Sequence, residues 1–131
     1  MPEIDPAEAR VALDGALSIR SGFTAHHGLL VTNLTSRDLL INTSGTLIAQ
    51  VVDPAGGAVV GGYSGFVFAM LKRFTVAPTE TARIPMLVAT DSFIPELGYA
   101  VPAGQWGIQA TLDPATGYTG RTPILPLTIT S

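Results

Sequence analysis

The sequence predicts an all-β fold, an antiparallel β-sandwich of roughly seven to nine short strands that forms one domain over residues 1–131. Apolar residues alternate with other residues in short runs, which is the period of a strand with one buried face. Turn-forming residues separate these runs at about the 8 to 12 residue spacing that is typical of β-sandwiches. A chain of this length can bury a hydrophobic core of its own.

The first fifteen residues are a lead-in for which two structures are open. Asp5-Pro6-Ala7-Glu8 has the order of a helix start, with a capping side chain, a proline at the first helical position and an acidic residue in the first turn. Asp14-Gly15 would end this short helix. The apolar residues of 11–19 also alternate, and that pattern predicts one long edge strand instead.

Strand-like runs occupy most of the remaining chain. The turn Asp53-Pro54-Ala55-Gly56-Gly57 predicts a hairpin, and the same pattern returns at 113–117. Asn42 to Gly45 interrupts an apolar block, as happens where a strand changes sheets. Pro123 and Pro126 lack a backbone donor, so the last strand must lie at an edge or break. We expect strands over 16–20, 27–34, 39–42, 46–53, 58–60, 66–76, 82–89, 106–112 and 121–130.

The stretch from Gly98 to Leu112 gives the best evidence for the fold. Pro102 to Gly104 predicts a turn, and from Trp106 onward every second residue is apolar. This is the pattern of a strand that begins at a corner. We expect Pro102, Gly104 and Trp106 to form a structural corner, in which the indole covers the end of the core while its N–H reaches a backbone carbonyl.

The composition limits the partners that the protein can have. Charged residues make up 13% of the chain, about half the usual share, and 47% of the residues are hydrophobic. Small neutral residues can supply the remaining surface, but the mean hydropathy of +0.40 also fits a protein that hides apolar surface against a partner. The seven basic residues are scattered, which argues against nucleic-acid binding.

The sequence also indicates the cellular compartment. The absence of cysteine excludes disulfides and thiolate metal sites. The N-terminus lacks the pattern of a signal peptide, and no apolar run approaches the ~18 residues of a membrane span. We therefore expect a soluble, cytoplasmic protein without a membrane span.

No catalytic or metal-binding pattern stands out. His26 and His27 are adjacent and would point to opposite faces of a strand, so they cannot easily chelate one metal. Ser64 lies in a sequence that only partly resembles a nucleophile elbow. Asp91 and Glu96 share one loop, but two carboxylates make a poor calcium site. We expect no enzyme activity, no cofactor and no small-molecule substrate.

Two Asn-x-Ser/Thr sequences match the acceptor pattern for N-glycosylation. They are Asn33-Leu34-Thr35 and Asn42-Thr43-Ser44. The pattern is frequent by chance, and no secretory leader accompanies it. We treat both as accidental.

Two irregular stretches, 61–74 and 90–103, are the best candidates for a binding surface, because loops on a rigid sandwich commonly carry function. If they lie side by side, their aromatic and apolar side chains form one patch. The alternative is that most of these side chains fill the core or close the end of the sandwich. The candidate residues for binding a partner are Tyr63, Phe66, Phe68, Phe93, Ile94, Leu97 and Tyr99.

The order of motifs in four stretches resembles small bacterial Ig-like sandwiches. The order is similar to that of the intracellular proteinase inhibitor family, in which a polar TN strand end, a D-P-x-G hairpin, an aPgE turn and a PpGxY corner follow one another. The chain also resembles uncharacterised soluble proteins of actinobacteria that share the GYAVPAGQW-type corner. Thr79 stands where the turn usually has glycine, and Trp106 where the corner usually has tyrosine. The stretches are VTNLTS at 31–36, VVDPAGGAVVGG at 51–62, FTVAPTETARIPMLVAT at 74–90 and VPAGQWGIQATL at 101–112.

Two functions follow as expectations. The leading one is a non-catalytic Ig-like module that binds another protein or itself, as in a homodimer. The resemblance implies an alternative, the inhibition of an intracellular serine protease. An inhibitor of that kind needs an exposed, extended loop, for which 91–100 is the candidate. The motifs do not fix a reactive site, so no inhibitory residue is carried over.

Overall fold

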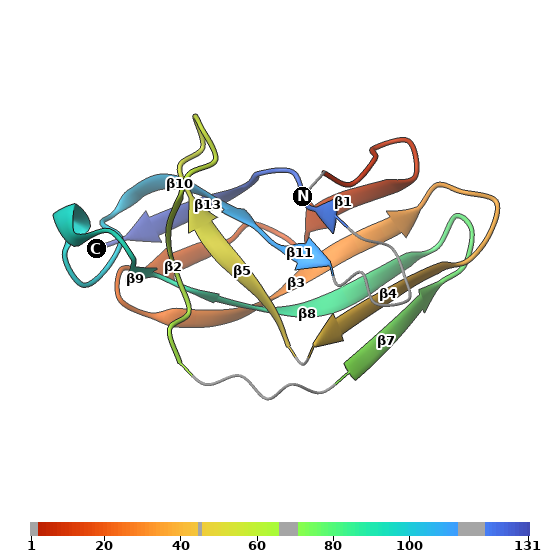
Figure 1. The fold of residues 1–131 in the computed structure, drawn as a ribbon, viewed down its shortest axis with the longest axis horizontal. Coiled ribbons are helices and arrows are strands. Elements are labelled where there is room, and N and C mark those ends of the chain that lie inside the picture. Colours follow the sequence, from red (N-terminus) through yellow and green to blue (C-terminus); the bar gives the residue numbers. More distant parts are fainter. Residues whose placement is uncertain (1–2, 45, 66–70, 113–119) are drawn as a thin grey trace.

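The computed structural model describes residues 3–44, 46–65, 71–112 and 120–131, and it confirms the all-β sandwich (Figure 1). One 3-10 turn, η1 (Pro95–Leu97), precedes β10. The strands are β1 (Ala9–Leu13), β2 (Ser18–Arg20), β3 (Thr24–Asn33), β4 (Leu39–Ser44), β5 (Leu47–Val52), β6 (Val59–Gly62), β7 (Leu71–Val76), β8 (Thr81–Ala89), β9 (Asp91–Ser92), β10 (Gly104–Gln109), β11 (Thr111–Leu112), β12 (Gly120–Arg121) and β13 (Leu125–Thr130).

Strand β5 belongs to both layers of the sandwich. Its first half, Leu47–Ala49, pairs in parallel with β8, and its second half pairs antiparallel with β10. The strand order is therefore β1-β3-β8-β5-β10-β13-β2, with β6 also on β5 and β9 on β6. The sequence predicted a change of sheet at 42–45, and the strands on the two sides of this interruption do lie in different sheets: β4 pairs with β7, whereas β5 belongs to the nine-stranded sheet. The crossing between the layers inside β5 is a second change, which the sequence did not predict.

The lead-in is a turn followed by a strand, so the predicted N-terminal helix is wrong. The backbone N–H groups of Glu8 and Ala9 donate to the Asp5 carbonyl, at 2.9 and 3.1 Å, and the Asp5 carboxylate accepts from Ala7 N–H at 2.9 Å. The chain then leaves the helical path because the Ala9 side chain is buried at the start of β1. Burial in the sheet outweighs the local helix signal.

The alternative prediction, one long edge strand over 11–19, is correct in that most of the alternating apolar residues lie on strands, but these are two separate strands, β1 and β2. The chain breaks after β1, where Gly15 has a φ of +87°. Before the break β1 pairs antiparallel with β3, and after it β2 pairs in parallel with β13. The first part of the chain therefore contributes an edge strand to each layer.

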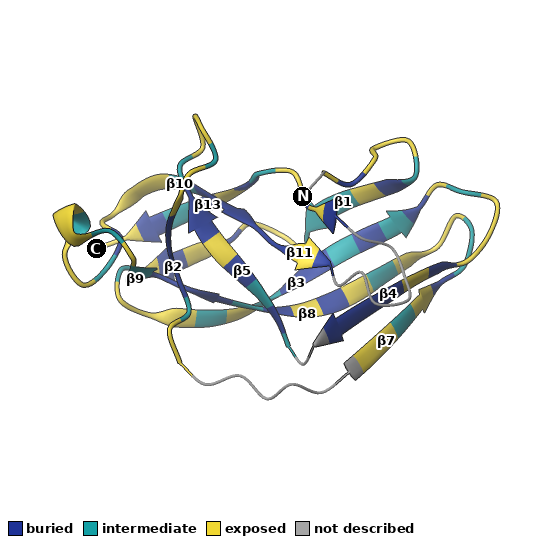
Figure 2. Cartoon of the chain, in the orientation of Figure 1, coloured by how far each residue is buried: buried dark blue, intermediate teal, exposed yellow. Residues whose placement is uncertain are grey.

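The core lies between the two layers, and Figure 2 shows buried residues on strands of both of them. Alternate residues of β3 and β8 are fully buried, and alternate residues of β10 and β13 face them from the other layer. The predicted turn at 113–117 and residues 66–70 of the predicted strand 66–76 lie outside the described residues. Fully or almost fully buried members of this core are Leu29, Val31, Ile84, Met86, Val88, Ile108, Leu127 and Ile129.

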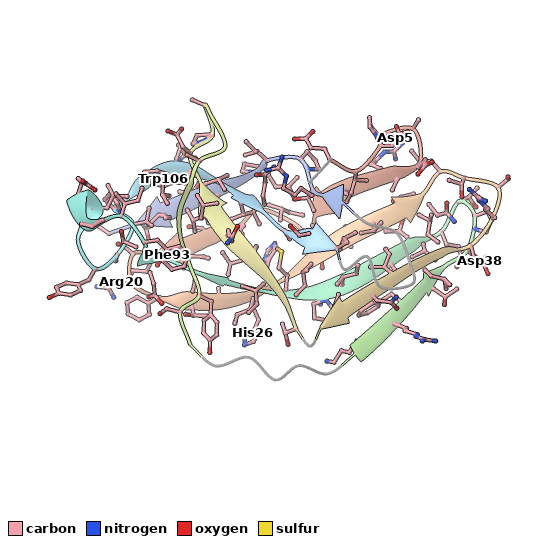
Figure 3. All side chains as sticks on the ribbon, viewed as in Figure 1. Asp5, Arg20, His26, Asp38, Phe93 and Trp106 are labelled. Carbon is pink, nitrogen blue, oxygen red and sulfur yellow. The ribbon has the colours of Figure 1, made fainter. Side chains whose placement is uncertain are left out.

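Strands β3 and β8 run nearly the full length of the molecule, so their connecting loops lie at opposite ends (Figure 1). One end contains residues 20–23 and 90–101, and we call it the aromatic end. The other contains residues 33–38 and 77–80, and we call it the Asn33 end. Figure 3 shows Arg20 and Phe93 at the first end and Asp38 at the second.

Candidate functional site

The aromatic end exposes three large rings. The exposed fractions are 56% for Phe23, 48% for Phe93 and 101% for Tyr99. They account for three of the six large hydrophobic side chains that are exposed in the described part of the chain. The Arg20 guanidinium lies 5.3 Å from the centre of the Phe23 ring, in reach of a cation–π contact.

The structure separates the predicted binding residues into exposed and packed ones. Phe93 and Tyr99 are exposed, whereas Ile94 and Leu97 are half-buried and pack against the core. Tyr63 is half-buried, and its loop is tied to this end by a hydrogen bond of 2.8 Å from the Ser64 hydroxyl to the Asp91 carboxylate. Phe66 and Phe68 lie outside the described residues.

Phe23 was missed by the sequence reasoning. It follows Ser21-Gly22 and precedes β3, so it belongs to a turn and to no alternating run. The sequence feature that could have pointed to Phe23 as an exposed residue is its position directly after the Ser21-Gly22 turn. Its position beside 90–101 depends on long-range contacts that local patterns do not contain.

The loop that carries Phe23 is held by the buried side chain of Thr90. The Thr90 hydroxyl accepts a hydrogen bond from Gly22 N–H at 2.8 Å and lies 3.0 Å from the Phe23 carbonyl, to which it donates. The backbone N–H of Thr90 also donates to that carbonyl, at 3.2 Å. Next to it, Val101 N–H donates to the Thr90 carbonyl at 2.9 Å. The ring is therefore presented from a fixed backbone.

The segment that carries Phe93 and Tyr99 is closed by its own hydrogen bonds. Ser92 N–H donates to the Tyr99 carbonyl at 3.0 Å, and the Ser92 hydroxyl accepts from Ile94 N–H at 3.1 Å. Phe93 N–H donates to the Val60 carbonyl of β6 at 2.9 Å. Loops that are ordered before binding lose less conformational entropy when a partner arrives.

The same segment is not the extended loop that protease inhibition would require. Residues 95–97 form η1, in which Leu97 N–H donates to the Ile94 carbonyl at 3.0 Å. Leu97 is half-buried against the core, so the loop is anchored in its middle. The expectation of an extended loop at 91–100 is corrected on this point.

The predicted corner is a packed turn at the start of β10. Trp106 is half-buried against the core, and its indole N–H donates to the Pro102 carbonyl at 2.9 Å. Gly104 has a φ of +150°, which a residue with a side chain rarely adopts. Trp106 thus covers part of the core, while its neighbours at this end remain exposed.

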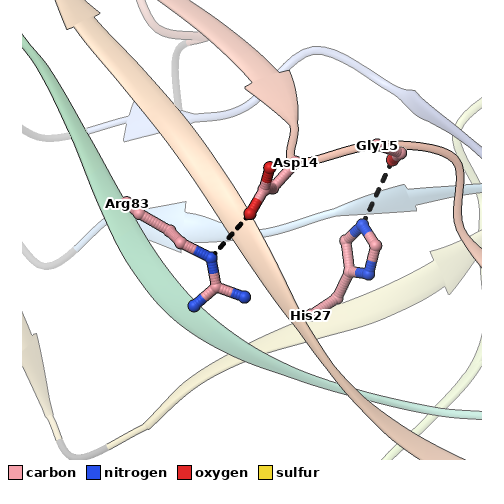
Figure 4. A network of polar contacts seen from close by, with 4 residues as sticks. All are labelled: Asp14, Gly15, His27 and Arg83. Carbon is pink, nitrogen blue, oxygen red and sulfur yellow. Dashed lines mark hydrogen bonds and ion pairs between the residues drawn. The ribbon is translucent and has the colours of Figure 1, made fainter.

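The residues that were weighed for catalysis or metal binding are dispersed. His27 Nε2 lies 3.2 Å from the Gly15 carbonyl (Figure 4), and the neighbouring His26 is exposed. Glu96 lies on η1 and is exposed. It takes no part in the hydrogen bond between the Ser64 hydroxyl and the Asp91 carboxylate. Across the described ranges, three or more His, Cys, Asp or Glu side chains do not gather at any one place.

The Asn33 end is built around a buried amide. Asn33 is fully buried, and its Nδ2 donates to the carbonyls of Arg37 at 2.7 Å and Val76 at 2.8 Å. Its Oδ1 accepts from Thr35 N–H at 2.8 Å. This network joins the end of β3 to the following loop and to β7. Asn33 is also the asparagine of the first Asn-x-Ser/Thr sequence, and its side chain is buried. Asn42, the asparagine of the second, is 1% exposed.

Comparisons with known proteins identify distant structural neighbours. No protein-family model matches the chain, and no curated protein is significantly similar to it in sequence. The crystal structure of the CARDB domain of the PF1109 protein from Pyrococcus furiosus, in complex with di-metal ions, is similar with a TM-score of 0.48 and 12% identity, over 94% of this chain and 88% of that one. A solution structure of the same domain gives a TM-score of 0.40 and 15% identity, over 98% and 97%. These likenesses are too distant to carry an argument about what this chain binds.

The described residues form no helix with the length and apolar character of a membrane-spanning segment.

Proposed function

We propose that the chain is a non-catalytic Ig-like module that binds another protein through the aromatic end. The observation that supports this proposal is the exposure of Phe23, Phe93 and Tyr99 at one end of the sandwich, on loops fixed by internal hydrogen bonds. Solvent-exposed rings that converge on one end are characteristic of an interaction surface.

The chemistry of this end suits a protein partner. Tyrosine and arginine are enriched among the residues that dominate binding energy at protein interfaces. Tyr99 and Phe93 offer large apolar area with few rotatable bonds, so little side-chain entropy is lost on contact. Arg20 adds a guanidinium that can hydrogen-bond to carboxylates or backbone carbonyls of the partner while it remains over Phe23.

Affinity capture from a lysate of the source cells tests the proposal with a matched pair of double variants. One is Phe93→Ser with Tyr99→Ser at the aromatic end. The other is Leu34→Ser with Leu40→Ser, which removes side chains of 42% and 45% exposure elsewhere on the surface. We expect a protein that is enriched by the wild type and the leucine variant and is lost with the aromatic variant. Equal enrichment by all three proteins, or enrichment by none, would contradict the proposal.

Inhibition of a serine protease, the alternative from the resemblance, has no supporting observation among the described residues. The segment 91–100 contains η1 and is anchored by Leu97, as described above. Protein binding is therefore the function that we propose.

A further inference from the structure

The edge strand β1 has backbone groups that face away from its neighbour. In antiparallel pairs the hydrogen-bonded positions alternate along the strand. Asp14 N–H donates to the Gly28 carbonyl and Leu34 N–H donates to the Glu8 carbonyl, both at 2.9 Å. The even-numbered residues of this register therefore bond to β3, and the N–H and C=O groups of residues 9, 11 and 13 point outward.

Two of the three outward positions are available to another strand. Ala9 N–H already donates to the Asp5 carbonyl at 3.1 Å. Val11 and Leu13 lie further along β1, whose described pairing is with β3 alone. Arg10 and Val11 also line an open depression of about 360 Å³, bordered by Ile4 and Pro123. The outer side of the strand is thus open at Val11, one of the two positions with free backbone groups.

Arg10 of β1 and Asp14, the residue that follows β1, carry opposite charges on one face of the sheet. Val11 and Leu13 are half-buried against the core, so Arg10, Ala12 and Asp14 point to the outer face of the sheet. Arg10 and Asp14 are both exposed and stand at equal distances, two residues each, on either side of Ala12. The strand is therefore complementary in charge to an antiparallel copy of itself.

We propose that two copies of the chain associate by antiparallel pairing of their β1 strands about a two-fold axis at Ala12. This register places Val11 opposite Leu13 of the second copy, so that both free backbone positions form hydrogen bonds. It also places Arg10 opposite Asp14 of the second copy, twice by symmetry. Opposite charges directly across a strand pair stabilise the pairing, and an isologous contact of this kind closes at a dimer.

Two of the neighbouring registers are opposed by charge. A shift that centres the axis on Arg10 brings the two guanidinium groups of that residue face to face. A shift that centres the axis on Val11 brings Asp14 opposite Glu8 of the second copy. Like charges directly opposite each other destabilise a strand pair. A shift that centres the axis on Leu13 places Asp14 opposite Ala12 and forms neither Arg10–Asp14 pair. The distribution of charge thus favours the register centred on Ala12.

Asp14 is held in position for this contact by a residue of β8. Arg83 Nε donates to Asp14 Oδ2 at 2.7 Å (Figure 4). Oδ1 is therefore the oxygen that we assign to Arg10 of the second copy. The Arg83 side chain crosses Gly28, where an added Cβ would clash with the Arg83 guanidinium. Gly28 gives the guanidinium room to lie against the sheet beside the edge strand.

Sedimentation equilibrium, up to millimolar concentration, tests this interface through charge reversal. We expect the wild type to dimerise and Arg10→Asp to raise the dimer dissociation constant about tenfold or more, because both cross-strand pairs become repulsive. Arg37→Asp is the matched control, since it makes the same change in net charge at the Asn33 end and leaves the dissociation constant unchanged. Arg10→Lys preserves the charge and keeps the dimer.

A second measurement examines the backbone. The amide protons of Val11 and Leu13 exchange with solvent more slowly as protein concentration rises, if they become hydrogen-bonded in the dimer. Val11→Pro removes one outward donor without removing a bond to β3, and we expect it to weaken the dimer while the fold persists. A wild type that stays monomeric, or a dimer that is insensitive to both Arg10→Asp and Val11→Pro, would overturn the inference.

This interface is separate from the proposed binding surface. The double variant Phe93→Ser with Tyr99→Ser is expected to leave the dimer dissociation constant unchanged. If that variant abolishes the dimer and Arg10→Asp does not, the second copy binds at the aromatic end and the β1 interface is wrong. If the Phe93→Ser/Tyr99→Ser variant no longer captures a partner but still dimerises, the result supports the proposed function and leaves the β1 interface unaffected.

Discussion

The Asn33 end and the aromatic end are each held by one buried polar side chain, but they present different surfaces. At the first end the Asn33 amide bonds to carbonyls of two neighbouring segments, and at the second the Thr90 hydroxyl bonds to the backbone of the 20–23 loop. The loops at the aromatic end display the rings of Phe23, Phe93 and Tyr99, whereas those at the Asn33 end carry no aromatic residue and display Leu34 and charged residues such as Asp38 (Figure 3). Rigidity is common to both ends, so the difference between them lies in what the rigid loops expose.

The largest effect on stability is expected at the Asn33 end. Asn33→Ala removes two donors and one acceptor from a fully buried position and leaves the Val76 carbonyl without that partner. Buried groups that lose a partner cost about 1–3 kcal/mol each, so we expect a loss of about 3 kcal/mol or more. Urea denaturation measures it. A loss below ~1 kcal/mol would show that the network does not hold this end together.

Trp106→Ala should have the next largest effect. The indole is half-buried, packs against the core and donates to the Pro102 carbonyl, so we expect a loss of about 2 kcal/mol. Trp106→Phe retains most of the packing and should lose less than half as much. Thermal denaturation of the two variants measures the difference. Equal losses would mean that the hydrogen bond, and not the packing of the ring, fixes the corner.

Thr90→Val is expected to cost about 1–2 kcal/mol, because Gly22 N–H loses its acceptor while the shape of the side chain is kept. The change should be concentrated at the aromatic end. Hydrogen exchange should become faster at Gly22 and Phe23 and remain unchanged at the Asn33 end. Thr90→Ser keeps the hydroxyl and serves as the control. A uniform increase in exchange over the whole chain would contradict a local role for Thr90.

Thr79→Gly is expected to stabilise the protein by about 1 kcal/mol. Thr79 has a φ of +69° in the turn between β7 and β8, where Glu80 N–H donates to the Ala77 carbonyl. This backbone conformation is unfavourable for a β-branched residue and favourable for glycine. The midpoint of urea denaturation should rise. An unchanged or lower midpoint would indicate that contacts of the threonine side chain compensate for the strained backbone.

The sequence predicted those parts of the fold that depend on local patterns. Alternation identified most strands. The family resemblance, and not a local pattern, singled out Thr79 as standing where the turn usually has glycine, and the structure has a positive φ at this residue. The crossing of β5 between layers was not predictable, since it depends on pairing with β8 and β10, which lie far along the chain. The helix signal at Asp5 failed for a similar reason, because β3 pairs with the residues that follow it.

The candidate site was predictable only in part. The sequence singled out 90–103 as a binding loop but could not separate the exposed Phe93 and Tyr99 from the packed Ile94 and Leu97. Alternation assigns faces within a strand, whereas these residues lie in a loop whose orientation is set by hydrogen bonds to distant segments. Phe23 joins them through Thr90, which is 67 residues away along the chain.

Site-specific photo-cross-linking tests most directly whether the aromatic end is the binding surface. A photoreactive phenylalanine analogue replaces Tyr99 in one protein and Leu40, which is 45% exposed, in a matched one. Both are irradiated in lysate of the source cells, and the adducts are identified by mass spectrometry. We predict a specific protein adduct from position 99 that position 40 does not give. The same adduct at comparable yield from both positions, or an adduct from position 40 alone, would contradict the account.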